Sequence, residues 1–156
     1  MLELILMCIL LHLFADYTLQ GWLASGKQKV WWDDQINKML DMYKAQLGYN
    51  EKFDPYNNKT RIDNEHERLK RKYGSDWAMA MFEHSLYWTL VTFAPIIFFN
   101  RVNDWVVLGL VVFNTIFHCV VDDLKANKFA ICLVDDQIAH FIQIIFTCAV
   151  CKYFFM

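Results

Sequence analysis

Histidine and aspartate recur at helical spacing within stretches of the chain that are otherwise apolar. The residues concerned lie in four places and are His12, Asp16 and Gln20; His84; His118, Asp122 and Lys125; and Asp136, Gln137 and His140. Residues four apart lie on one face of a helix, so H-x3-D places an imidazole beside a carboxylate. Imidazole and carboxylate are ligands that Zn, Mn and Fe take in proteins. The pattern predicts a site for one or two divalent metal ions, with Zn as the first expectation.

Each residue has an expected role in such a site. The predicted metal ligands are His12, Asp16, His84, His118, Asp122 and His140. A metal ion with an open coordination position activates bound water and so supports hydrolysis. The other predicted roles are Asp136 as ligand or general base, Lys125 and Lys27 as cations for an anionic or phosphate-bearing substrate, and Gln20 and Gln137 as substrate-orienting residues. The favoured function is a metal-dependent hydrolase.

Two other interpretations of the same residues stay open. A histidine inside a membrane helix often serves as a hydrogen-bonding core residue, and Asp122 with Lys125 can form a simple salt bridge. The protein would then be a non-catalytic membrane protein whose polar middle segment binds a partner. A proton or ion pathway is the second alternative. The far halves of the predicted spans offer only a few polar residues for it, which are Thr89, Thr92, Asn114, Gln143 and Thr147.

The composition points to the lipid bilayer as the environment. Hydrophobic residues make up 56% of the 156 residues and aromatic residues 17%, while 20 of the 32 charged residues fall between Lys27 and Asp76. The rest of the chain is too apolar for an ordinary soluble domain or a disordered protein. The formal net charge of -2 offers no basic excess, so no nucleic-acid partner is expected.

An all-α fold, a four-helix transmembrane bundle, is expected to position the site. Residues 1–156 are predicted to form a single membrane domain, with spans at 1–20, 77–99, 105–121 and 138–156, a helical insertion at 21–76, and a cytoplasmic or re-entrant connection at 122–137. Each span has roughly the 17–25 residues that a helix needs to cross about 30 Å of hydrocarbon.

The insertion is expected to contain two helices. The spacing of apolar residues predicts an amphipathic helix that begins at Asp33 or Asp34 and stops at Gly48. Two tryptophans precede it, which favours a helix lying on the membrane interface, and a lid packed on the bundle is equally compatible. After an Asn- and Pro-rich loop, residues 62–73 predict a second, mostly solvated helix that ends at Gly74.

Helix topology predicts that the chemical groups converge. In an up-down-up-down bundle, the ends of the first and third spans and the starts of the second and fourth lie on one side. Every predicted site residue lies at or near such an end. The connections on that side carry 13 of the 15 Lys and Arg residues, so the positive-inside rule puts them in the cytoplasm and both termini outside. Four short helices can bury such a cluster alone or at a homodimer interface.

The order of these motifs resembles that of a family of small integral membrane proteins of bacteria and their phages, which has no assigned function. The resemblance covers all four spans and rests on H-x3-D-x3-Q from His12, Lys27, His84, H-x3-D-x2-K from His118, and D-Q-x2-H from Asp136. More distantly, the chain is similar to membrane-bound metal-dependent hydrolases, whose motifs are also intramembrane His and Asp. These resemblances imply a protein of the bacterial inner (cytoplasmic) membrane and supply no substrate. Segment 31–76 is longer than the family pattern.

Overall fold

The computed structural model describes residues 1–18, 21–50, 55–99 and 104–155, and every regular element in that part of the chain is an α-helix. The expected all-α class is confirmed for these residues. Four long helices form a bundle, namely α1 (Leu2–Thr18), α5 (Asp76–Thr92), α7 (Asp104–Ala126) and α8 (Leu133–Phe155). The remaining helices are α2 (Leu23–Gly26), α3 (Lys29–Asn50), α4 (Pro55–Tyr73) and α6 (Ala94–Phe99).

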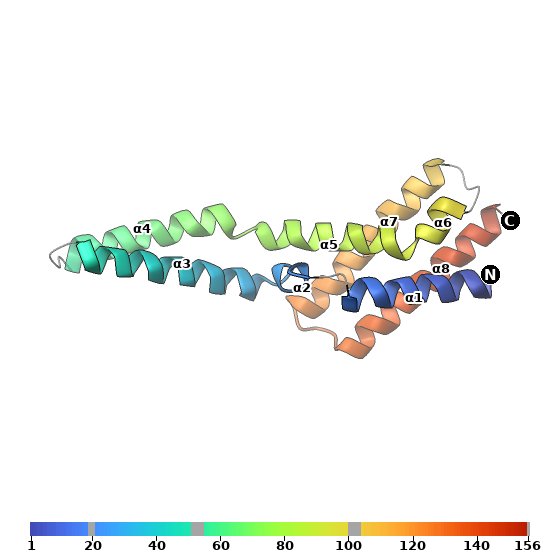
Figure 1. Cartoon of the computed structure of the whole chain (residues 1–156), viewed down its shortest axis with the longest axis horizontal. Helices are drawn as coiled ribbons and strands as arrows, with labels where there is room; N and C mark the ends of the chain where they lie inside the picture. The colour runs from blue at the N-terminus through green and yellow to red at the C-terminus, as the bar shows by residue number, and fades with distance from the viewer. Residues whose placement is uncertain (19–20, 51–54, 100–103, 156) are drawn as a thin grey trace.

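The four bundle helices alternate in direction. Helix α5 packs against α1 and α7, and α8 packs against the same two helices, so the four close into a ring. Figure 1 shows both termini at one end of the bundle, with α2 and the α7–α8 connection at the opposite end. The C-terminal ends of α1 and α7 and the N-terminal ends of α5 and α8 therefore lie at a common end, which we call the hairpin end.

The predicted span 77–99 is not one continuous helix. Helix α5 ends at Thr92, and α6 follows with Pro95 in its first turn. Proline has no backbone N–H to donate to the carbonyl of Val91, and its ring clashes with a preceding helical turn. The prediction of an unbroken helix was wrong because it followed apolar length and overlooked this proline.

The predicted connection 122–137 is much shorter in the structure. Helix α7 continues past its predicted end and α8 begins before its predicted start, so Asp122 and Asp136 both lie on helices. The loop between them contains no re-entrant helix. The carboxylate of Asp135 accepts the backbone N–H of Cys132 at 3.2 Å, which is half of a capping box and explains why α8 begins early.

The helices of the insertion are longer than predicted. Helix α3 begins before Asp33 and continues through Gly48, so the predicted glycine stop is wrong. A glycine within a helix costs only about 1 kcal/mol relative to alanine, and α3 tolerates it. Helix α4 begins at Pro55, inside the expected loop, because proline suits the first helical position. Its end just before Gly74 agrees with the prediction.

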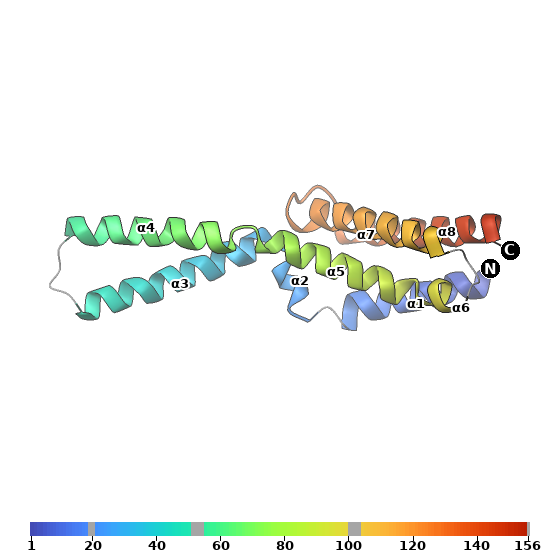
Figure 2. The ribbon, with the colours of Figure 1, turned by 90° about the horizontal axis from the view of Figure 1, so that it is seen from above.

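Helices α3 and α4 pack against each other as a hairpin with its own small core. The core consists of Ile36, Leu40 and Leu69, surrounded by Met39, Ile62 and Tyr73. Figure 2 shows this α3–α4 hairpin continuing the long axis of the molecule away from the bundle. At about 1.5 Å per residue it projects roughly 30 Å. The apolar face of α3 packs on α4, and not on the bundle as the predicted lid would. The predicted location of this helix on the membrane interface stays a prediction.

Two helices are long and apolar enough to cross a membrane, and these are α7 and residues Leu133–Tyr153 of α8. Helices α1 and α5 have 17 residues each. At about 1.5 Å per residue they reach roughly 26 Å, a little less than the ~30 Å hydrocarbon core of a bilayer. Two of the four expected spans therefore meet the length and composition of a membrane helix among the described residues.

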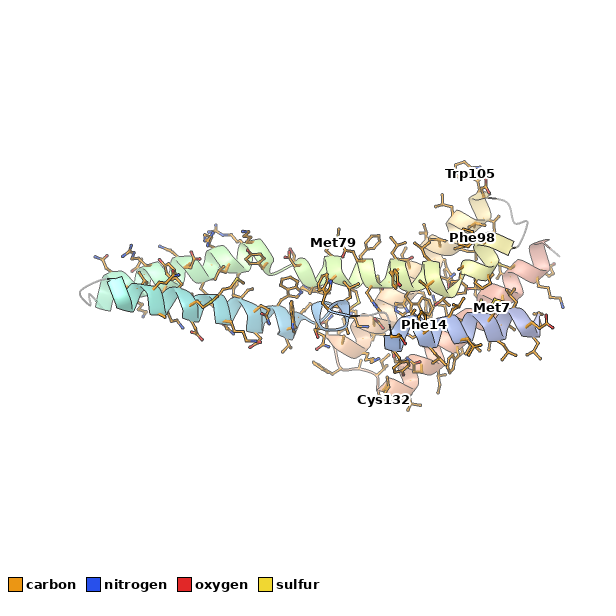
Figure 3. All side chains as sticks on the ribbon, viewed as in Figure 1. Met7, Phe14, Met79, Phe98, Trp105 and Cys132 are labelled. Carbon is orange, nitrogen blue, oxygen red and sulfur yellow. The ribbon has the colours of Figure 1, made fainter. Side chains whose placement is uncertain are left out.

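Large apolar side chains cover the outside of the bundle. Exposed examples occur on every bundle helix, including Leu6 and Leu10 on α1, Phe82 and Leu90 on α5, Val112 and Ile116 on α7, and Ile138 and Ile142 on α8. Figure 3 shows the labelled side chains of Met79 and Trp105 projecting from the bundle, and Trp105 is 79% exposed. A monomeric soluble protein rarely exposes apolar patches of this extent.

Polar side chains fill much of the inside. Buried polar residues along the bundle axis include Ser85, Thr89, Thr92, Asn114, Thr115, Gln143 and Thr147, in addition to the histidines and aspartates. Toward the termini the interior becomes apolar and contains Cys8, Phe93, Ile96, Cys148 and Cys151. Apolar outside and polar inside is the distribution that a bilayer favours.

Candidate metal centre

The bundle interior contains a group of ionisable side chains that we call the His–Asp cluster. Its members are His84 of α5, His118 and Asp122 of α7, and Asp136 and His140 of α8. Each of the five is at most 2% exposed. The two H-x3-D and D-x3-H spacings align a histidine and an aspartate on one face of α7 and one face of α8. The packing of α7 on α8 then brings the two faces together.

Asp122 lies at the centre of the cluster. Its Oδ2 is 3.1 Å from Nε2 of His84 and 3.6 Å from Nε2 of His118. Its Oδ1 is 3.6 Å from Nε2 of His140. The same ring nitrogen of three histidines, on three helices, is therefore directed at one carboxylate.

Aromatic stacking holds two of these rings in place. The indole of Trp88 stacks on the ring of His118, with centroids 4.1 Å apart and an interplanar angle of 19°. The ring of His118 also stacks on that of His140, at 4.2 Å and 28°, and Trp88 lies 5.3 Å from His140 at a tilt of 42°. Because Trp88 is completely buried, its indole has little freedom to move and restricts the ring planes of both histidines.

The orientation of His140 follows from a hydrogen-bond chain on the side toward the termini. Asn114 donates Nδ2 to the carbonyl of Leu110 at 2.8 Å, which leaves its Oδ1 to accept from Gln143 Nε2 at 2.9 Å and from Thr147 at 3.0 Å. The Oε1 of Gln143 then faces Nδ1 of His140 at 3.5 Å. This contact places the proton of a neutral His140 on Nδ1 and leaves the lone pair of Nε2 facing the cluster.

Four buried atoms of the cluster have no hydrogen-bond partner among the described residues, namely Nδ1 of His84, Nδ1 of His118, Nε2 of His140 and Oδ1 of Asp136. The last two face each other at 3.4 Å. A nitrogen lone pair and a carboxylate oxygen repel each other unless a cation or a proton lies between them. Buried polar groups are almost always partnered, so this pair marks a place for a positive charge.

Lys27 supplies a positive charge at Oδ2 of Asp122, the oxygen that does not face His140. Its ammonium is 2.5 Å from Oδ2 of Asp122 and 3.2 Å from Nε2 of His84. The backbone of Lys27 is held to the end of α7, because its carbonyl accepts Nδ2 of Asn127 at 3.2 Å. The same Asn127 side chain accepts the N–H of Lys29 at 2.8 Å. The start of the α3–α4 hairpin is thus fastened next to the cluster.

Lys125 and Gln137 engage the other oxygen of Asp136. Lys125 donates to Oδ2 of Asp136 at 2.6 Å, and the amide nitrogen of Gln137 donates to the same oxygen at 3.2 Å. Gln137 also donates to Asp16 at 3.3 Å and accepts from His12 through its Oε1 at 3.0 Å. The Oδ2 side of Asp136 is therefore saturated while its Oδ1 remains unpartnered.

Two sets of three groups in the described residues have ligand atoms within 4.8 Å of one another and can hold a metal ion. One is His118, Asp122 and His140, and the other is Asp16, His84 and His118. Zn–N and Zn–O bonds of about 2.0–2.1 Å place tetrahedral ligands about 3.3 Å apart. The separations of 3.4–3.6 Å around His140 exceed that value by only about 0.3 Å.

The structure brings together all but one of the residues singled out in the sequence. His12, Asp16, Lys27, His84, His118, Asp122, Lys125, Asp136, Gln137 and His140 form one connected network. Gln20, which was expected to orient substrate, lies outside the described residues. His12 belongs to neither candidate metal set, because Trp88 and Gln137 occupy both of its ring nitrogens. Its predicted role as a ligand stays a prediction.

Sequence reasoning missed the residues that hold the cluster in place. The role of Trp88 was not anticipated, although an indole N–H inside an apolar helix needs a buried acceptor. Asn114, Gln143 and Thr147 were noted only as scattered polar groups. Their spacing on two separate helices gave no sign that they join into the chain behind His140. The clamp formed by Asn127 was also missed, since the residue was assigned to a connection.

An open pocket of about 430 Å³ leads to the His–Asp cluster from the hairpin end. Its lining consists of Asp16, Tyr17, Ala24, Lys27, Gln28, Asp122, Lys125, Ala126, Phe129, Leu133 and Gln137. Asp122 belongs to both the cluster and the pocket wall. A molecule in the pocket can therefore reach the atoms that converge on this carboxylate.

The ionisable groups of the network carry a net negative charge when the histidines are neutral. Lys27 and Lys125 contribute two positive charges, and Asp16, Asp122 and Asp136 contribute three negative charges. Isolated charge inside a low-dielectric bundle is costly, so the network favours binding of an additional cation.

Comparison of the chain with protein-family models, with curated proteins and with solved structures finds no match.

Proposed function

We propose that the protein is an integral membrane protein that binds a divalent transition metal in the His–Asp cluster, with Zn preferred and Mn or Fe as alternatives. The proposed metal ligands are His118, Asp122, Asp136 and His140. The observation that carries this proposal is the unpartnered pair formed by Nε2 of His140 and Oδ1 of Asp136 at the rim of a buried ligand set. A metal ion between these atoms partners both of them and offsets the negative charge of the network.

The membrane assignment is supported by the outer surface of the bundle. Apolar side chains cover all four helices, and two of the helices have the length and composition of a span. We propose that α1 and the broken pair α5 and α6 complete a four-helix transmembrane bundle in the bacterial cytoplasmic membrane. The basic residues of the α3–α4 hairpin favour a cytoplasmic location for the hairpin end.

We propose metal-dependent hydrolysis as the use of this ion. The pocket beside Asp122 leaves room for a water molecule and a substrate, and a bound divalent ion would lower the pKa of that water. Asp16 lines the pocket and is suited to accept the proton, whereas Lys125 is suited to hold an anionic group of the substrate. Lys27 also lines the pocket and donates to Oδ2 of Asp122, and His84 faces the same oxygen from inside the bundle.

Metal analysis of the purified full chain tests the proposal. The protein in detergent is dialysed with one equivalent each of Zn²⁺, Mn²⁺ and Fe²⁺, and retained metal is measured by elemental mass spectrometry. About one ion per chain is expected for the wild type, with a loss of at least tenfold in His140→Gln and Asp122→Asn. His66→Gln is the matched control, because His66 lies on α4, far from the cluster. Absence of bound metal in the wild type, or full retention in His140→Gln, would contradict the assignment.

A metal-free network with a partner-binding hairpin is the second candidate function. It is favoured by one observation, namely that Lys27 and Lys125 already satisfy one oxygen each of Asp122 and Asp136. In that case the cluster holds the helices together and the projecting hairpin contacts a partner. The same metal analysis separates the two candidates.

A further inference from the structure

The pocket at the hairpin end has two chemically different parts. Its floor is polar and contains Asp16, Asp122, Lys27, Lys125 and Gln137. Its rim is apolar and contains Tyr17, Phe129 and Leu133, which are 64%, 75% and 53% exposed. A ligand that fits both parts must carry a polar group and an apolar extension.

The backbone at Phe129 points to a use for this exposed rim. Phe129 has a φ of 53°, a left-handed conformation that favours glycine or asparagine. The N–H of Ala130 bonds to the carbonyl of Leu124 at 2.8 Å, and this closure of the loop holds Phe129 in place. A bulky aromatic residue in this conformation is strained, and here its ring is not even buried. The ring is instead displayed next to the pocket.

In the proposed transmembrane bundle, the pocket would lie at the level of the lipid headgroups. It lies where α1 and α7 end and α8 begins, so the apolar outer surface stops at its rim. Aromatic and basic residues surround the same end, including Trp22, which is 59% exposed, and Lys29, whose ammonium lies 4.1 Å from the ring centroid of Trp77. Trp and Lys are typical of the membrane–water interface.

The net charge of the pocket floor determines which type of lipid headgroup it attracts. Asp16 and Asp122 balance Lys27 and Lys125 among the lining residues, so the floor is neutral as it stands. A divalent ion in the His–Asp cluster would turn the net negative charge of the whole network, Asp136 included, into a net positive charge. This step rests on the proposed function. An anionic headgroup would then be attracted to the floor, with Lys125 in reach of it.

We propose that the pocket binds a membrane phospholipid with an anionic headgroup, and that this lipid is the substrate class of the metal centre. The phosphate lies on the floor beside Lys125 and Asp122. The acyl chains leave across Phe129 and Leu133 and continue along the exposed apolar side chains of α8, such as Ile138.

Binding measurements with a short-chain lipid test this proposal. The full chain in detergent, with its metal content determined in the same sample, is titrated with dihexanoyl phosphatidylglycerol, dihexanoyl phosphatidylcholine and inorganic phosphate. The anionic lipid is expected to bind at least tenfold more tightly than either of the other two. Equal binding of inorganic phosphate would overturn the lipid assignment, because the apolar rim would then contribute nothing.

Variants separate the rim from the metal centre. Phe129→Gly removes both the ring and the backbone strain and is expected to weaken lipid binding about tenfold with unchanged metal content. Phe82→Ala is the control, since Phe82 is an exposed aromatic residue of α5 that does not line the pocket. Unchanged lipid affinity in Phe129→Gly would overturn the proposal while leaving the metal site intact. Loss of metal from the wild type would instead mark failure of the proposed function.

Discussion

Trp88 donates its indole N–H to Nδ1 of His12 at 2.8 Å in the middle of the bundle. An indole N–H can only donate, so Nδ1 must accept and the proton of a neutral His12 lies on Nε2. That nitrogen then donates to Gln137, which turns the amide nitrogen of Gln137 toward Asp16 and Asp136. The direction of four hydrogen bonds therefore follows from one tryptophan.

Replacing Trp88 with phenylalanine is expected to destabilise the bundle and to release His12. The change leaves Nδ1 of His12 buried without a donor, which costs about 1–3 kcal/mol. It also removes part of the ring that stacks on His118. Chemical unfolding in detergent measures the loss of stability, and ¹⁵N NMR of the histidine rings detects a second tautomer of His12.

The control for this prediction is Trp105→Phe. Trp105 lies at the start of α7 and is 79% exposed, so its loss should change neither quantity. Equal stability of Trp88→Phe and the wild type would show that the hydrogen bond to His12 is not part of the folded core.

Replacing Lys27 with methionine is expected to make stability depend on metal. The ammonium of Lys27 is the only charge partner within 3.0 Å of Asp122 that the described residues provide. Removing one partner of a buried ion pair typically costs about 3–5 kcal/mol because the other charge stays buried. A metal ion bound to Asp122 would restore much of that loss. Thermal unfolding with Zn²⁺ and with a chelator measures both effects.

Lys128→Met is the matched control for the lysine variant. Lys128 pairs with Asp123 at 2.8 Å, but its side chain is 60% exposed. An exposed pair contributes only about 0–1 kcal/mol, so this variant should unfold like the wild type with or without metal. A Lys27→Met protein that is as stable as the wild type in the presence of chelator would contradict the prediction.

The residues of the site could be predicted from the sequence more accurately than the helix boundaries and packing partners around them. His118 and Asp122 could be paired from their spacing alone, because a helical turn fixes which side chains share a face. The alternation of helix direction then brought His84 and His140 to the same end. Partners that depend on the rotation of one helix against another, such as Gln143 with Asn114, could not be derived in this way.

The insertion was the least predictable part of the chain. The sequence predicted an amphipathic helix here, and Ile36 and Leu40 lie on its apolar face. The pattern alone does not show which surface covers that face. Membrane, bundle and a second helix all satisfy it equally. Here Leu69 of α4 covers that face, and the mostly polar sequence of α4 gave little sign of it.

Replacing Gln143 with leucine is expected to weaken metal binding without unfolding the bundle. Gln143 holds Nδ1 of His140 and so keeps the lone pair of Nε2 directed at the cluster. Losing the partner of a metal-bound histidine typically lowers metal affinity by about 10–100-fold. Competition with a chelating dye measures the dissociation constant. Gln143→Glu can still accept from His140 and should retain tighter binding than Gln143→Leu. Equal metal affinities for the two variants would show that Gln143 does not support metal binding through His140.

Replacing Leu69 with alanine is expected to loosen the α3–α4 hairpin and leave the bundle intact. Leu69 is 4% exposed and forms a core with Ile36 and Leu40 that shares no residue with the core of the bundle. Truncating a buried leucine costs about 2–5 kcal/mol, a large amount for so small a core. Hydrogen exchange read by mass spectrometry should therefore rise in α3 and α4 only, with unchanged metal content. Leu108→Ala, at an exposed position on α7, should change neither quantity. Faster exchange in α7 and α8 of Leu69→Ala would instead mean that hairpin and bundle fold as one cooperative unit, and that the clamp of Asn127 on Lys27 transmits the change.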